Sequence, residues 1–158
     1  MSEEQQGSSP GIVVRQLVES DLEAWLPLWE GYLRFYRHPL PPSVTRTTFE
    51  RLTRGERGMT GLVAERDGDL VGLAHLLLHA GTWSVGGNCY LEDLWVEPAD
   101  RGGGVGRALI DATYRVAAKA GAERVYWHTQ QYNGAARSLY DSVATPTSFV
   151  VYEHLLAR

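Results

Sequence analysis

A cluster of glycines at residues 101–107 (RGGGVGR) is the clearest group in this sequence that could bind a ligand. It follows a predicted strand at residues 89–96, and a predicted helix begins within it. Backbone amides at the start of a helix are unsatisfied donors that suit a phosphate, and glycines let a ligand approach the backbone closely. An ordinary flexible turn would fit the same residues, so the cluster alone leaves both interpretations open.

Two familiar phosphate-binding loops do not fit this cluster. The P-loop ends in Gly-Lys-Ser/Thr, whereas Gly106 is followed here by Arg107 and Ala108. The dinucleotide-binding fingerprint needs glycines at its first, third and sixth positions, and no register of the cluster supplies all three. A phosphate site at these residues would therefore be of another type.

Glu92 and Asp93 are neighbouring carboxylates in the predicted strand at residues 89–96. Alternation along a strand predicts that Glu92 shares a face with Leu94 and Val96, while Asp93 lies on the opposite face. A salt bridge within the sheet would account for either residue, and for Asp93 we expect an arginine partner.

Histidine and cysteine side chains give no metal site in this sequence. His75 and His79 share one face of a predicted strand but are too far apart to chelate one ion. His128, at the end of another predicted strand, is either an alternative general base or a partly buried polar residue. Cys89 is the single cysteine, so an internal disulfide framework is excluded, and a lone buried thiol is usually inert.

The hydrophobic pattern predicts strands and helices in alternation. Strands are predicted at residues 12–14, 62–65, 70–74, 89–96, 124–129 and 149–155, and helices at residues 20–36, 43–52, 105–120 and 133–142. Ser20 and Glu23 have the spacing of a capping box, and Pro27 must kink or split the first helix. The pair Asp67-Gly68 predicts a hairpin.

Length and composition indicate one soluble globular domain. The chain has 158 residues, of which 44% are hydrophobic and 22% charged, with a formal charge of −4. We expect a flexible polar tail at residues 1–10 and a single α/β (α+β) domain at residues 11–158. The negative charge argues against nucleic acid or an anionic membrane as the main partner and is compatible with a cationic substrate. No apolar run approaches the ~20 residues of a membrane span, and the N-terminus lacks the apolar core of a secretory signal, so a cytoplasmic location is expected.

Residues 90–110 resemble the signature segment of the GNAT superfamily of N-acetyltransferases. In that family an apolar strand end is followed by a proline turn and by Arg/Gln-x-x-Gly-x-Gly/Ala, which opens a helix. Arg101, Gly104 and Gly106 fill that pattern without a gap. Residues 91–93 (LED) are most similar to diamine (polyamine-type) acetyltransferases and their bacterial relatives.

A second family segment, Asn-x-x-Ala followed by an aromatic residue, is matched by Asn133, Ala136 and Tyr140. These residues are three and four positions apart and should share one face of a helix. Asn133 could cap that helix, contact the cofactor, or do both. The glycine turn that often follows this segment in the family is absent after Tyr140.

The resemblance implies a mixed, mostly antiparallel central sheet flanked by helices and splayed at the signature strand to admit acetyl-CoA. It implies acetyl-CoA as cosubstrate, with its pyrophosphate on the glycine cluster and its pantetheine arm along the signature strand, and no metal. The cofactor-binding residues implied are Leu94, Trp95, Val96, Arg101, Gly102, Gly103, Gly104, Val105, Gly106, Arg107, Asn133 and Ala136.

The resemblance also implies the catalytic groups. Tyr140 would protonate the departing thiolate, and Glu92 would accept the proton of the amine. The first helices would wall the acceptor site, where Trp29, Glu30 and Glu92 are candidate substrate contacts, although Trp29 also fits the core and Glu30 a solvated surface.

Three functions follow from these expectations. The first is N-acetylation of a small-molecule primary amine by direct attack in a ternary complex. The second is acetylation of a protein lysine or N-terminus, which would need an open groove. The third is a non-catalytic acyl-CoA-binding module, which would need neither Tyr140 nor Glu92. Family members are commonly dimers, and the predicted strand at residues 149–155 could pair between subunits.

Overall fold

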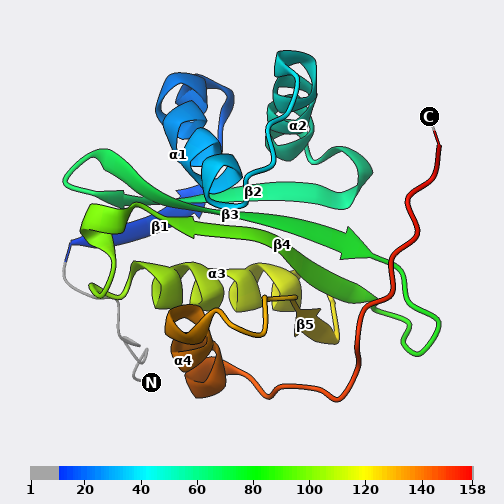
Figure 1. Cartoon of the computed structure of the whole chain (residues 1–158). Helices are drawn as coiled ribbons and strands as arrows, with labels where there is room; N and C mark the ends of the chain where they lie inside the picture. The colour runs from blue at the N-terminus through cyan, green and yellow to red at the C-terminus, as the bar shows by residue number, and fades with distance from the viewer. Residues whose placement is uncertain (1–10, 158) are drawn as a thin grey trace, which may run out of the picture. The chain divides into compact units, whose positions relative to one another are not determined.

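The computed structural model describes residues 11–157 and contains one five-stranded sheet with strand order β1-β2-β3-β4-β5 (Figure 1). The strands are β1 (Ile12–Gln16), β2 (Met59–Arg66), β3 (Asp69–His79), β4 (Asn88–Val96) and β5 (Arg124–Tyr126). The helices are α1 (Leu22–Phe35), α2 (Pro42–Arg54), α3 (Val105–Lys119) and α4 (Gly134–Val143). The first four strands are antiparallel, and β5 joins β4 in parallel.

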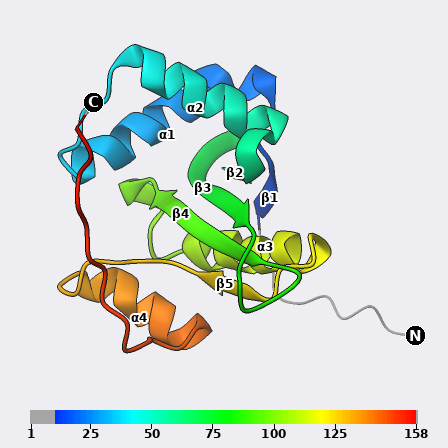
Figure 2. The ribbon, with the colours of Figure 1, turned by 90° about the vertical axis from the view of Figure 1, so that its right-hand side faces the viewer.

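Helices α1 and α2 cover one face of the sheet and α3 covers the other (Figures 1 and 2). All five strands and these three helices belong to a compact unit that ends at His128, and Thr129–Arg158 form a second unit that carries α4. Among the described residues, no helix has both the length and the apolar composition needed to cross a membrane. The tail predicted at residues 1–10 lies outside the described residues.

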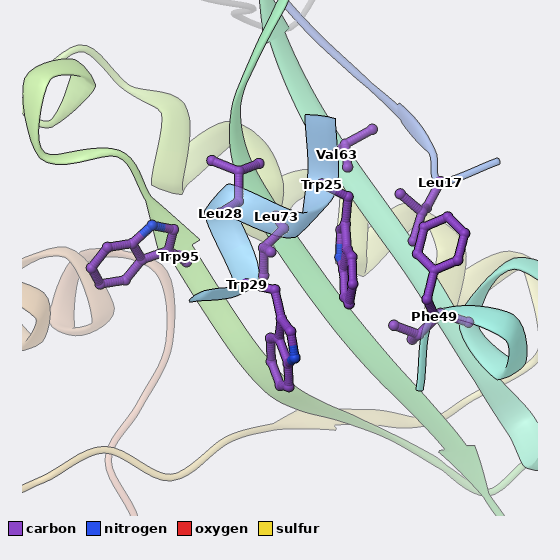
Figure 3. Packing of buried hydrophobic residues seen from close by; sticks show 9 residues of the cluster. Leu17, Trp25, Leu28, Trp29, Phe49, Val63, Leu73 and Trp95 are labelled. Carbon is purple, nitrogen blue, oxygen red and sulfur yellow. The ribbon is translucent and has the colours of Figure 1, made fainter. Parts of the chain in front are cut away.

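The core beneath α1 and α2 is built around Trp25, which is fully buried. Its ring lies 5.7 Å from that of Trp29 and 5.0 Å from that of Phe49 (Figure 3). The buried members of this cluster are Leu17, Trp25, Leu28, Trp29, Phe49, Leu52, Val63, Leu73 and Trp95. Because α1 supplies three of them, the packing of this helix fixes the side chains that it presents toward β3 and β4.

The hairpin predicted at Asp67-Gly68 is confirmed. Both residues have positive φ values, 52° and 86°, and they connect β2 to β3. A two-residue turn with this conformation follows the right-handed twist of the strands that it joins.

Local predictions are wrong at two places. Ser20 does not cap α1, because it lies inside a short 3-10 helix (Glu19–Asp21) and α1 begins only at Leu22. The carboxylate of Asp21 accepts a hydrogen bond from the backbone amide of Val18 instead, at 2.9 Å. Of the two alternatives for Pro27, a split of the first helix is excluded, because the helix continues through it to Phe35.

The second error concerns the strands at the C-terminal end. β5 ends at Tyr126 rather than at residue 129, and residues 149–155 form no strand. Their run of apolar and β-branched residues favours an extended strand, but a strand also needs a partner for its backbone groups. The described part of the chain provides none for this segment.

Candidate active site

Strand β4 contains one extra residue, Glu92, relative to its neighbour β3. His75 is paired with Asp93, whereas the next residue of β3, Leu76, is paired with Leu91. Such a bulge reverses the alternation of side chains on the bulged strand. Asp93 therefore lies on the sheet face covered by α1, while Leu91 lies on the opposite face with Leu76.

This bulge corrects the prediction that Glu92 and Asp93 face opposite sides of the sheet. Both carboxylates line a cavity of about 460 Å³, which we call the acidic cavity. Such a volume suits a small molecule. Its lining residues are Trp29, Tyr32, Leu33, Tyr36, His38, Leu40, Thr48, Met59, His75, Leu77, Glu92 and Asp93.

Asp93 is held by His75 and not by the predicted arginine. Its Oδ2 atom lies 2.9 Å from Nδ1 of His75. On the other side of the imidazole ring, the indole N–H of Trp25 donates to Nε2 of His75 at 3.0 Å. Burial and the charge of Asp93 raise the pKa of Tyr32 well above its usual range, so its hydroxyl stays protonated.

The pKa of Glu92 is raised above the ordinary value for a glutamate. The largest cause is desolvation of its carboxylate, followed by repulsion from Asp93, while His75 acts in the opposite direction. A carboxylate with a raised pKa binds a proton more readily, which is the property that a general base requires. A perturbed carboxylate in a cavity is also typical of functional sites.

The edge of β4 is open beyond Tyr90. β5 pairs only with residues 88–90 of β4, so from Leu91 onward no strand of the described chain lies beside that edge. The predicted cofactor residues Leu94, Trp95 and Val96 lie in this open part. Backbone groups of an exposed strand edge can bind an extended ligand as a further strand would.

The glycine cluster forms a tight turn that leads from β4 into α3. Gly102 and Gly104 have positive φ values of 80° and 87°, and α3 starts at Val105. The first amides of α3 are therefore available to an anion beside the end of β4. Arg101 secures the turn, because its Nε atom donates to the carbonyl of Val96 at 3.0 Å and its guanidinium lies 4.7 Å from the Trp95 ring centre. Residues 103, 105, 106 and 107 complete the predicted set of cofactor residues at this turn.

The structure also places the other side chains that the sequence analysis considered, which are Trp29, Glu30, His128 and Cys89. Trp29 lines the acidic cavity, but Glu30 lines a separate groove between α1 and α2 and is exposed. His128 is exposed, and its Nδ1 atom lies 3.1 Å from the hydroxyl of Tyr90. Cys89 is fully buried, and burial raises the pKa of its thiol to about 11, as expected for an inert cysteine.

The remaining predicted residues belong to the second unit. Asn133 occupies the N-cap position of α4 without a side-chain capping hydrogen bond. Asn133, Ala136 and Tyr140 are all half-buried, in agreement with a shared helix face. No group of three or more metal-ligating side chains occurs within residues 11–157.

Sequence reasoning missed the group formed by Trp25, His75, Asp93 and Tyr32. Trp25 and Tyr32 belong to the first helix, which the resemblance placed at the wall of the acceptor site, and His75 was weighed only as a metal ligand. The pairing of His75 with Asp93 depends on the register of β3 and β4, to which the pattern of a single strand gives no access.

Comparison with known proteins shows which proteins this chain resembles. A model of the acetyltransferase (GNAT) family matches residues 25–144. The chain is 40% identical over 144 residues to the D-amino-acid N-acetyltransferase HPA3 of Saccharomyces cerevisiae, covering 90% of this chain and 89% of that protein. It is 30% identical over 141 residues to the uncharacterized N-acetyltransferase YhfO of Bacillus subtilis, covering 88% and 94%. Its fold matches that of AAC(6')-Iy in complex with the bisubstrate analog CoA-S-monomethyl-acetylneamine, with a TM-score of 0.80, 19% identity and coverage of 92% and 99%.

Replacing Asp93 tests the electrostatic coupling within the acidic cavity. In Asp93→Asn the pKa of Glu92 should fall, because one of the two causes that raise it is removed. It should stay above the ordinary value, because desolvation remains. Carbon-13 NMR titration of the Glu92 carboxyl measures this directly. Glu97→Gln, at the end of the same strand, should leave the titration unchanged, and an equal shift in both variants would contradict a specific effect of Asp93.

Proposed function

Because the chain belongs to the acetyltransferase (GNAT) family, we propose that it transfers an acetyl group from acetyl-CoA to the primary amine of a small molecule bound in the acidic cavity. It is an N-acetyltransferase, as its sequence motifs predicted. The observation that carries the proposed acceptor class is the pairing of Glu92 and Asp93 in a cavity of about 460 Å³ with aromatic walls. Carboxylates and aromatic faces both attract an ammonium group.

The reaction is direct attack in a ternary complex. The acceptor nitrogen attacks the thioester carbonyl carbon, a C–N bond forms, and the C–S bond breaks. Glu92 takes the proton of the amine, directly or through water, and Tyr140 supplies a proton to the departing thiolate. A backbone amide of β4 near Leu94 or Trp95 polarises the carbonyl oxygen. The buried thiol of Cys89, with its raised pKa, favours this route over one through an acyl-cysteine.

Acetyl-CoA is held by the open edge of β4 and by the turn before α3. Leu94, Trp95 and Val96 supply backbone groups to the pantetheine arm, and the amides of residues 102–107 bind the pyrophosphate. Asn133 and Ala136 contact the cofactor from α4.

Among small amines, D-amino acids are the first acceptors to test, because a relative that is 40% identical carries that activity in its name. Diamines and polyamines are the second, because residues 91–93 resemble diamine acetyltransferases. The volume of the acidic cavity suits either of these small molecules, whereas a protein lysine would need an open groove. A non-catalytic acyl-CoA-binding module would not require two carboxylates in such a cavity.

Turnover on a panel of amines tests the proposed function. Thiol release from acetyl-CoA should occur with D-amino acids or diamines and be weaker with L-amino acids, aminoglycosides and lysine peptides. Glu92→Gln and Tyr140→Phe should each lower kcat by roughly 10²-fold or more, since proton transfer contributes at least that much. Glu97→Gln serves as the control carboxylate.

Two results would contradict this proposal. Preference for lysine peptides over every small amine would identify a protein acetyltransferase. Wild-type kcat in both Glu92→Gln and Tyr140→Phe would remove these residues from the chemistry.

Two glycines with similar backbone conformations allow the acetyl-CoA site to be tested by itself. Gly102 and Gly68 have φ values of 80° and 86°, and an added Cβ would meet nothing within 4 Å at either. Alanine at either position should cost about 1–2 kcal/mol of stability through backbone strain. Only Gly102→Ala should also raise the Kd for CoA in calorimetry, by roughly tenfold, as expected for about one lost charge-assisted hydrogen bond. Equal CoA affinity in both variants would argue against the turn as the pyrophosphate site.

We also propose a cytoplasmic homodimer. A single free cysteine fits a reducing compartment, and acetyl-CoA is an intracellular metabolite. In residues 149–156 the large apolar side chains are at least 66% exposed, an unusual extent of apolar surface for a monomer. We infer that this segment forms the strand predicted from the sequence only when it pairs with a second copy.

The oligomeric state tests the role of this segment. Sedimentation should give the wild type a mass of twice 17.6 kDa. Val151→Asp should shift the protein to a monomer, because a charge would then lie in the paired surface. Val85→Asp changes a still more exposed valine outside the segment and should leave the dimer intact. A monomeric wild type would disprove the proposed dimer.

A further inference from the structure

His75 is a buried imidazole whose two ring nitrogens both have partners. Its exposed fraction is 2%, and the fully buried Trp25 donates its indole N–H to Nε2 at 3.0 Å. An indole N–H can only donate, so Nε2 must be the unprotonated, accepting nitrogen. The proton of the neutral ring is therefore on Nδ1, from which it is donated to Oδ2 of Asp93 at 2.9 Å.

The other neutral tautomer of His75 is opposed by this arrangement. A proton on Nε2 would point at the indole N–H, so a hydrogen bond would be replaced by two donors about 3 Å apart in a buried site. The titratable groups that line the acidic cavity with His75 are Tyr32 from α1, Tyr36 and His38 from the segment after α1, and Glu92 and Asp93 from β4.

No lysine or arginine of the described residues lines the acidic cavity, so none of these side chains pairs with Asp93 there. The hydrogen bond that His75 donates to Asp93 orients its carboxylate beside Glu92. A protonated amine is the ligand that would complete this arrangement.

We propose that Trp25 and His75 form a tautomer lock that keeps the carboxylate of Asp93 oriented to bind the protonated acceptor amine, while the neighbouring Glu92 receives its proton. His75 acts as a positioning residue, and Trp25 acts through His75. The assignment of an amine ligand rests on the proposed function, whereas the locked tautomer rests only on the hydrogen bonds within the fold.

Nitrogen-15 NMR of the wild-type enzyme tests the lock without any substrate. The ring nitrogens of His75, assigned by their absence in His75→Asn, should show the Nδ1–H tautomer at pH 8. A proton on Nε2 with Nδ1 unprotonated would overturn the lock.

Trp25→Phe tests the function of the lock, because it removes the indole donor and leaves Nε2 free to carry the ring proton. Where the proton moves to Nε2, Asp93 loses the hydrogen bond that orients it. KM for the amine at pH 8 should rise by up to roughly tenfold, as expected for about one lost hydrogen bond to a charged group, with KM for acetyl-CoA unchanged.

Phe49→Leu is the matched control for lost packing. Phe49 contacts the Trp25 ring at 5.0 Å and is buried, so its truncation disturbs the same part of the core without touching either hydrogen bond of His75. It should lower stability and leave both the His75 spectrum and KM for the amine as in the wild type.

The possible outcomes separate the lock from the proposed function. An unchanged KM for the amine in a Trp25→Phe variant whose His75 proton has moved to Nε2 would overturn the role of Asp93 in binding the ammonium. The same rise of KM in Phe49→Leu would overturn the lock as its cause. If no amine in the panel is acetylated, the proposed function fails, whereas the NMR spectrum still decides whether the tautomer is locked.

Discussion

One extra residue in β4, Glu92, determines which side chains of this strand lie on the sheet face covered by α1. Without the bulge at Glu92, strict alternation would carry Trp95 to the same face as Leu91. Trp95 instead packs in the cluster beneath α1, while Leu91 is paired with Leu76 on the opposite face. The same shift brings Asp93 beside His75 and places both carboxylates in one cavity. A single insertion thus serves the packing of α1 and the charge of the site together.

Two carboxylates in a cavity with aromatic walls oppose each other and lose hydration, which is costly unless hydrogen bonds compensate. Asp93 receives such a bond from His75, and it is the better anchored of the pair. No hydrogen bond is among the effects that act on the pKa of Glu92, and desolvation and repulsion from Asp93 therefore raise it. Neighbouring residues of one strand therefore acquire different properties: one is a fixed charge and the other a group that can exchange a proton.

Much of the fold followed from local patterns in the sequence. The hairpin at Asp67-Gly68, the helix that opens after Gly104 and the order of strands and helices along the chain all depend on turn chemistry and periodicity over a few residues. The prediction failed where a distant partner decides the outcome. The alternation of LEDLWV gives no sign of a bulge, since only the register against β3 reveals it, and residues 149–155 show a strand pattern without a strand partner.

The roles of some candidate residues could likewise be predicted from local patterns, whereas the roles of others depend on distant partners. Glycine spacing at residues 101–107 indicated an anion site because φ values above zero and free amides are local properties. The contact between His75 and Asp93 joins residues 18 positions apart and could not be inferred in that manner. In the folded chain β4 offers backbone groups along its open edge and carboxylates on its α1 face. The proposed donor and acceptor sites therefore lie on the same strand, which agrees with the proximity that direct transfer between them requires.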